Sequence, residues 1–207
     1  MISYTTIKHS GKSTFEDRKS IFIGNACPVQ CEEEAIAFVK KIKSEYPDAR
    51  HNVYAYVTKD NYITRYSDDG EPQGTAGLPV LDVIRKNECT NVAIVVTRYF
   101  GGILLGTGGL VHAYTEAAKA ALSDGEIVTL QMHDKLKISC AYPEYNKIKF
   151  KADTNNYKID GIIFSDSVEF FVTVIEEKTE AFIKDINELC AGKVKIELSE
   201  KIFDSIL

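Results

Sequence analysis

Glycine is spread unevenly along the chain, and this unevenness constrains the fold more than any other feature. Of the thirteen glycines, only Gly161 and Gly192 lie after residue 130. Glycine allows backbone conformations and close approaches that other residues resist, so the two parts of the chain use different backbone geometry. A helix pattern over Leu110–Leu122 ends at Asp124-Gly125. We therefore predict an amino-terminal domain over residues 1–127 and a carboxyl-terminal domain over residues 128–207.

The amino-terminal part contains both strand and helix patterns. Val92–Thr97 is an aliphatic run typical of a buried strand, and Glu32–Tyr46 has apolar residues at helical spacing. In chain order we predict a strand at 20–28, a helix at 32–46, a hairpin of 53–57 and 62–66 about Lys59–Asn61, a helix from Pro79 to about Asn87, a strand at 92–97 and an alanine-rich helix at 110–122.

The carboxyl-terminal part reads strand, helix, strand, strand, helix, strand, at 135–140, 144–153, 158–164, 167–175, 178–190 and 193–198. This βαββαβ order is that of the ferredoxin-like fold. We therefore expect a four-stranded antiparallel sheet with two helices on one face. The whole chain is predicted to be an α+β protein of two domains.

Composition excludes several classes of protein. With 44% hydrophobic and 27% charged residues, the chain has the make-up of a globular protein. Its net charge of -5 gives no general basic excess for nucleic acid. Five scattered cysteines are typical of reduced cytosolic thiols and disfavour a zinc site. The start lacks the apolar core of a signal peptide, and no apolar run approaches the roughly 20 residues that span a bilayer. We expect a cytoplasmic protein with no membrane partner.

The segment RYSDDGEPQGTAGLP, from Arg65 to Pro79, is the first of two unusual motifs. It places three carboxylates within four residues, which is costly unless they are solvated, cation-bound or paired with arginine. Asp-Gly and Glu-Pro are also turn dipeptides, so a solvated turn is the other interpretation. As a binding loop, its candidate residues are Arg65, Asp68, Asp69, Glu71, Gly74 and Thr75.

The segment VTRYFGGILLGTGGLVHAY, from Val96 to Tyr114, is the second motif. A strand ends here, and glycines lead into a helix whose N-terminus offers free N–H groups to an anion. Thr107 stands where a Walker loop requires lysine, and Val111 where a dinucleotide fingerprint requires glycine. The pattern fits an anion or nucleic-acid site and fits tight packing alone. The candidate site residues are Arg98, Tyr99, Phe100, Gly101, Gly102, Gly106, Thr107, Gly108 and Gly109.

Side chains suited to acid, base and charge stabilisation are present, namely His51, Asp68, Asp69 and Arg98. No pattern places a nucleophile beside a base, and His51, which opens a strand, is better explained as a structural histidine. The sequence therefore identifies no catalytic residue, no metal site and no cofactor.

The two motifs together resemble the signatures of the YigZ/IMPACT family, and ARHNVYAY (Ala49–Tyr56) is similar to its third block. The resemblance runs through Asp17–Leu122 with both signatures intact, while the last 77 residues match by arrangement more than by motif. It implies an IMPACT-type amino-terminal domain, an α/β sandwich resembling domain IV of elongation factor G, followed by a ferredoxin-like domain. It also implies a link to translation, because eukaryotic members regulate it by competing for the activator of a starvation-sensing kinase.

We expect a noncatalytic protein that binds RNA, the ribosome or a translation-regulatory protein. The glycines and Arg98 would contact phosphate, while Tyr99 and Phe100 would stack on a base or a partner. The alternative is an enzyme that processes a phosphate ester or nucleotide, with Asp68 and Asp69 holding Mg²⁺, the one cofactor that this alternative would need.

The geometry of the site can also be predicted. The acidic loop and the glycine-rich helix start should lie together on one face, with His51 nearby. Arg98 should project toward the helix start at Gly106–Gly109 and bind phosphate there. Its competing fate is an internal ion pair with Asp68, Asp69 or Glu71.

Overall fold

The computed structural model describes residues 3–58 and 63–205. These residues form two compact units, one over Tyr4–Val128 and the other from Thr129 onward together with Ser3. Each unit has its own hydrophobic core. The predicted α+β class with two domains is confirmed.

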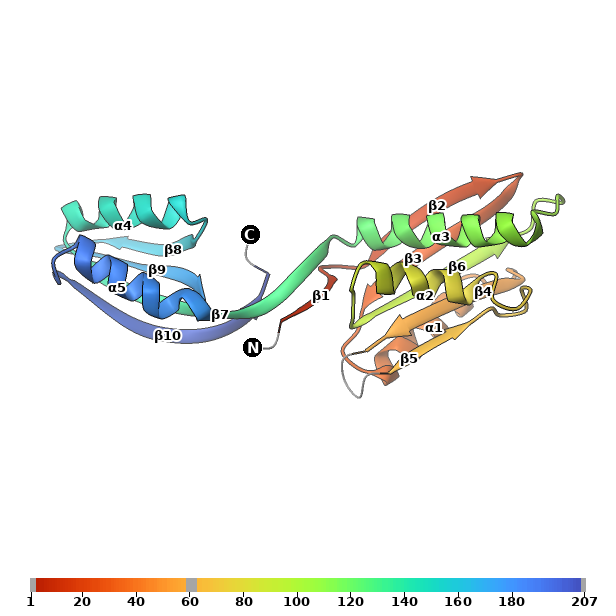
Figure 1. Cartoon of the computed structure of the whole chain (residues 1–207), viewed down its shortest axis with the longest axis horizontal. Coiled ribbons are helices and arrows are strands. Elements are labelled where there is room, and N and C mark those ends of the chain that lie inside the picture. The colour runs from red at the N-terminus through yellow and green to blue at the C-terminus, as the bar shows by residue number, and fades with distance from the viewer. Residues whose placement is uncertain (1–2, 59–62, 206–207) are drawn as a thin grey trace. The chain divides into compact units, whose positions relative to one another are not determined.

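The amino-terminal unit is built on a five-stranded antiparallel sheet in the order β2-β3-β6-β4-β5 (Figure 1). The predicted hairpin is present as β4 and β5, and its predicted turn at residues 59–61 lies outside the described residues. The strands of this sheet are β2 (Gly11–Asp17), β3 (Ser20–Pro28), β4 (His51–Val57), β5 (Thr64–Ser67) and β6 (Val92–Tyr99).

Helices cover both faces of this sheet, and β6 is therefore apolar on both sides. The helices are α1 (Glu32–Glu45), α2 (Gly77–Lys86) and α3 (Gly106–Asp124). Successive strand residues point to opposite faces, so Ile94 and Val96 pack in the core under α2 and α3, whereas Val95 packs with α1. Helix α3 lies so close to β3 that a Cβ on Gly24 would be 2.5 Å from the carbonyl oxygen of Ala117. The small side chains of α3 permit this approach, as expected.

The carboxyl-terminal unit has the predicted βαββαβ order, and its strands pair in the ferredoxin-like sequence β10-β7-β9-β8. Residues of both helices share one core with the sheet, so the helices cover the same face. The elements are β7 (Ile127–Cys140), α4 (Tyr142–Thr154), β8 (Lys158–Phe164), β9 (Val168–Ile175), the short 3-10 helix η2 (Glu176–Lys178), α5 (Thr179–Leu189) and β10 (Val194–Asp204).

Two details of this sheet differ from the prediction. Strand β1 (Tyr4–Ile7) also pairs with β7, so the sheet has five strands rather than four. Strand β7 begins at Ile127 rather than at residue 135, and β10 extends to Asp204 to pair with it. Val128, Leu130 and Met132 alternate with polar residues in this early part of β7, so the sequence already carried a strand pattern that the prediction missed.

None of the helices within residues 3–58 and 63–205 combines the length and the apolar composition needed to cross a membrane.

Candidate functional site

His51 and Arg98 lie directly opposite each other at one end of the amino-terminal sheet, because β4 and β6 pair in antiparallel register there. Cross-strand partners project from the same face. Val53 and Val96, the next residues in the two alternating series, lie in the core under α2 and α3. His51 and Arg98 therefore lie on the same face of the sheet as this core, one pair further toward the end of the strands. On the other side of Arg98, the ring of Phe22 lies 5.5 Å from its guanidinium carbon.

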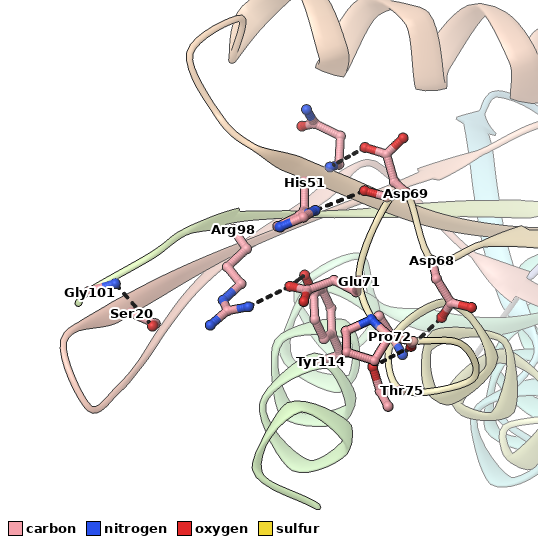
Figure 2. Close-up of polar contacts among 12 residues, drawn as sticks. Ser20, His51, Asp68, Asp69, Glu71, Pro72, Thr75, Arg98, Gly101 and Tyr114 are labelled. Carbon is pink, nitrogen blue, oxygen red and sulfur yellow. Dashed lines mark hydrogen bonds and ion pairs between the residues drawn. The ribbon is translucent and has the colours of Figure 1, made fainter. Parts of the chain in front are cut away.

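The Arg98 side chain is held by Glu71. Nη1 of Arg98 donates a hydrogen bond to Oε1 of Glu71 at 2.6 Å, and the same oxygen accepts the hydroxyl of Tyr114 at 2.8 Å (Figure 2). Only 7% of the Arg98 side chain and 4% of the Glu71 side chain are exposed. Burial, and then the neighbouring Glu71 carboxylate, raises the pKa of Tyr114. The phenol therefore stays protonated and acts as a donor.

Of the two fates predicted for Arg98, the structure contains the internal ion pair with Glu71. A guanidinium at the end of a buried strand loses its hydration, and a carboxylate at hydrogen-bonding distance offsets that loss. The expectation of an Arg98 directed at the helix start and free for phosphate is therefore corrected. Nε of Arg98 is buried, and it has no hydrogen-bond partner within the described ranges.

Asp68 fastens the acidic loop (residues 68–71) to the start of α2. Its Oδ1 accepts the N–H groups of Ala76 at 3.1 Å and Gly77 at 2.8 Å, and its Oδ2 accepts the N–H of Gly74 at 2.9 Å (Figure 2). These donors precede or begin the helix, where N–H groups lack intrahelical acceptors and the helix dipole favours negative charge. Asp68 thus serves as a helix cap.

Asp69 fastens the same loop to β4 and α1. Its Oδ2 accepts the N–H of Asn52 at 2.6 Å, and its Oδ1 accepts the ammonium of Lys43 at 2.7 Å. The main-chain carbonyl of Asp69 lies 2.8 Å from Nδ1 of His51 (Figure 2). Because a carbonyl only accepts, Nδ1 of His51 carries the proton.

The three carboxylates of the acidic loop therefore have separate partners and diverge. Asp68 and Asp69 are occupied by protein donors on different sides of the loop, so they do not fit a shared Mg²⁺ site. Within the part of the chain that the structure describes, no group of three or more His, Cys, Asp or Glu residues is placed to hold a metal ion. The acidic loop therefore has a structural role, which is to hold neighbouring helices and strands together.

Different structural constraints explain the glycines of the second motif. A Cβ on Gly101 would lie 2.0 Å from the carbonyl carbon of Lys19, so close packing requires glycine there. Gly102 and Gly106 have φ angles of +83° and +70°, which other residues adopt with strain. Gly108 has neither constraint, since a Cβ there would meet no atom within 4 Å. Packing therefore explains only part of the motif.

A cavity of about 420 Å³, the helix-start cavity, lies between the acidic loop and the first turn of α3. The acidic loop and the glycine-rich helix start thus meet, as expected, with His51 beside them. The residues singled out from the sequence that line it are His51, Glu71, Arg98, Phe100, Gly106 and Thr107. Gly108 and Gly109 follow in the same helical turn, which has no side-chain N-cap among the described residues.

Several other candidate residues do not line this cavity. Tyr99 follows Arg98 and points to the opposite face, where its hydroxyl donates to Asp48 at 2.9 Å. Arg65 belongs to β5, and its Nε lies 3.6 Å from Oε1 of Glu32 in α1. Gly74 and Thr75 belong to the turn before α2, as does Asp68; the Thr75 hydroxyl donates to a main-chain carbonyl in the same turn. These residues contribute to the fold of the domain and not to the wall of the cavity.

Five residues that line the cavity were not singled out from the sequence, namely Arg50, Pro72, Leu104, Leu105 and Leu110. Arg50 lines it and is exposed. Its position immediately before His51, in the ARHNVYAY block, was the available signal. Leu104 also lines it and is 81% exposed. Nothing in an aliphatic run indicates such exposure.

Comparison with known proteins gives the family. The chain matches the model of the Impact N-terminal domain over residues 18–122 and that of a domain of unknown function, DUF1949, over residues 138–193. The IMPACT family member YvyE of Bacillus subtilis (strain 168) is 38% identical over 199 residues, which are 96% of this chain and 92% of that protein. The chain belongs to the IMPACT family.

Other members of the IMPACT family match it over different lengths. The IMPACT family member YigZ of Escherichia coli (strain K12) is 37% identical over 163 residues, 76% of each chain. Protein IMPACT of Homo sapiens is 33% identical over 102 residues, 46% of this chain and 31% of that protein. A crystal structure described as a hypothetical protein has 31% identity and a TM-score of 0.60, covering 97% of this chain and 98% of its own. The likeness of that structure extends over both domains.

Proposed function

We propose that this IMPACT family member is a noncatalytic RNA-binding protein that acts in translation, and that the helix-start cavity receives the backbone of single-stranded RNA. A phosphate would lie at the N–H groups of the first turn of α3, near Arg50. Phe100 would stack on a base, as aromatic side chains do in proteins that bind single strands. The link to translation rests on the family resemblance.

Gly108 carries this proposal. It occupies a helical position where alanine would be favoured by about 0.5–1 kcal/mol, and neither packing nor backbone conformation requires glycine there. A bare backbone at the N-terminus of a helix allows an anion to come within hydrogen-bonding distance of the N–H groups. The uncapped first turn supports the same interpretation.

The two alternatives to RNA binding, a protein partner and an enzyme, have different support. The exposed side chains of Ile103 and Leu104, 42% and 81% exposed, favour a protein partner as the second candidate. The enzyme alternative has less support, since it relied on Asp68 and Asp69, whose carboxylates are occupied by protein donors.

The proposal is tested by fluorescence anisotropy with a labelled single-stranded oligoribonucleotide over a series of salt concentrations. Arg50→Ala should weaken binding by roughly fivefold and reduce the slope of log K against log salt by about 0.7, the contribution of one phosphate contact in a single strand. Arg85→Ala is the matched control, because Arg85 is an exposed arginine of the same domain that does not line the cavity. Equal effects of the two variants would contradict an RNA site here. Ribonuclease-resistant capture of one protein, lost in Leu104→Ser, would favour the second candidate.

A further inference from the structure

The carboxyl-terminal domain contains a second cavity, of about 680 Å³, that the proposed function does not use. Its volume is within the range of small-molecule sites, roughly 300–1,000 Å³. It lies where strands β7, β8 and β9 meet the turn that follows α4, so we call it the β8-β9 cavity. All of its lining residues belong to this one domain.

Strand pairing brings the polar lining residues together. His133 of β7 is paired with Ile175 of β9, and Lys158 of β8 is paired with Thr173 of β9. Paired residues share a face, and Thr173 and Ile175, two positions apart, share one as well. The four side chains therefore project from the same side of the sheet, and all of them line the cavity.

His133, one of the residues that line this cavity, has an unsatisfied hydrogen-bond acceptor. Its side chain is buried, with 1% of the residue exposed, and Nδ1 lies 3.0 Å from the carbonyl oxygen of Gln131. The carbonyl requires Nδ1 to be the donor, which leaves Nε2 of the neutral ring as an acceptor. Nε2 has no hydrogen-bond partner among the described residues. Because buried polar atoms are nearly always paired, this atom points to a ligand that donates a hydrogen bond.

The charge of the cavity indicates what else such a ligand carries. Lys158 and Lys178 line it, are exposed, and form no ion pair within residues 3–58 and 63–205. The carboxylate of Asp153, which also lines it, is already paired with Lys149 at 2.7 Å. Two uncompensated ammonium groups match a phosphate monoester, which carries about −1.5 to −2 charges at pH 7. A single carboxylate would compensate only one of them.

We propose that the β8-β9 cavity binds a small sugar phosphate, with the phosphate at Lys158 and Lys178 and a sugar hydroxyl donating to Nε2 of His133. The buried hydroxyl of Thr173 provides a further polar contact on the same face of the sheet. This site is separate from the proposed RNA site, which lies in the other domain and depends on Arg50. The two proposals can therefore fail independently.

The full chain with ¹⁵N-labelled histidine tests this site by NMR, with ribose 5-phosphate, inorganic phosphate and ribose as probes. Ribose 5-phosphate should move the Nε2 resonance of His133 and bind with a Kd of about 1 mM or tighter. Inorganic phosphate and ribose, each lacking one half of the ligand, should bind at least about tenfold more weakly. No movement of the His133 resonance with ribose 5-phosphate at about 10 mM would overturn the proposal, as would equal binding of all three probes.

Variants separate this site from general electrostatic attraction. Lys158→Ala and Lys178→Ala should each weaken the binding of ribose 5-phosphate by about tenfold, because each removes a charge-assisted contact. Lys184→Ala is the control, since Lys184 is an exposed lysine of α5 in the same domain that does not line the cavity. Both lysines of the site are exposed, so their replacement should leave the fold intact. Binding that is equally reduced in Lys184→Ala would overturn the proposal.

Discussion

Arg98, at the end of strand β6, and Glu71, in the acidic loop, form a buried ion pair in which Nη1 and Oε1 are 2.6 Å apart. The hydroxyl of Tyr114 in α3 donates to the same carboxylate oxygen. A strand, a loop and a helix from separate parts of the sequence therefore converge on one carboxylate. The pair is a structural element of the domain, and its removal should lower the free energy of unfolding.

Removing either partner of this pair should destabilise the amino-terminal domain. Arg98→Ala leaves Glu71 buried without its counter-charge, and we expect a loss of about 3–5 kcal/mol in the free energy of unfolding. The double variant Arg98→Met/Glu71→Leu should lose less, because it buries no unpaired charge. Urea denaturation followed by circular dichroism measures both. An Arg98→Ala protein as stable as the wild type would show that the pair contributes nothing to folding.

Asp68 should stabilise the start of α2. In Asp68→Ala, three backbone N–H groups lose their acceptor, and we expect a loss of about 2 kcal/mol in the free energy of unfolding. Asp68→Asn keeps one carbonyl oxygen and should lose less. Glu16→Ala is the control, because Glu16 is an exposed carboxylate on β2. Thermal unfolding of the three variants ranks them, and a loss in Glu16→Ala as large as that in Asp68→Ala would contradict the capping role.

Two glycines of the second motif should respond to alanine in opposite directions. The methyl group of Gly101→Ala would lie 2.0 Å from the carbonyl carbon of Lys19, so the domain should lose about 1–3 kcal/mol or more of stability. Gly108→Ala meets no atom within 4 Å and adds a better helix former, so stability should rise by up to about 1 kcal/mol. RNA binding should fall in Gly108→Ala, since the methyl group covers the helix N-terminus. A stabilised variant with unchanged RNA binding would remove the main support for the proposed function.

The stability of the amino-terminal domain should decrease in alkaline solution because of Tyr56. Burial, and then the hydrogen bond to Glu32, raises the pKa of this phenol from 10.0 to about 12. A raised folded-state pKa gives stability that is complete below pH 10 and is lost as the pH rises toward about 12, at most about 3 kcal/mol.

Tyr56→Phe tests this alkaline dependence. Between about pH 9 and about pH 11 the variant should lose less free energy of unfolding than the wild type, because the phenol of Tyr56 is no longer present to ionise. Tyr66→Phe is the control, since Tyr66 is 48% exposed. The same pH dependence in the wild type and both variants would show that Tyr56 is not responsible.

The sequence did not determine which acidic residue pairs with Arg98. Hydrophobic periodicity predicted the main strands and helices. The unusual chemistry of the two motifs was the reason for expecting them to lie together. Asp68, Asp69 and Glu71, however, are equivalent acids in sequence. Asp69 and Gly70 have φ angles of +46° and +88°, so the chain turns sharply and each carboxylate is directed elsewhere.

Tyr99 was a different kind of error, because the information was present. The alternation of side chains along a strand already placed Tyr99 on the face opposite Arg98. The place of Arg50 in the helix-start cavity and the existence of the β8-β9 cavity could not be predicted in this way. They depend on exposure and on strand register, which a single sequence does not specify.

The acidic loop is tied to α2 through Asp68, to α1 and β4 through Asp69, and to β6 and α3 through Glu71. It cannot swing outward without breaking several of these contacts at once. One wall of the helix-start cavity is therefore completed when the domain folds, before any ligand arrives. Association at this site should follow a single kinetic phase with no slow closing step, and little conformational entropy of the receptor should be lost on binding.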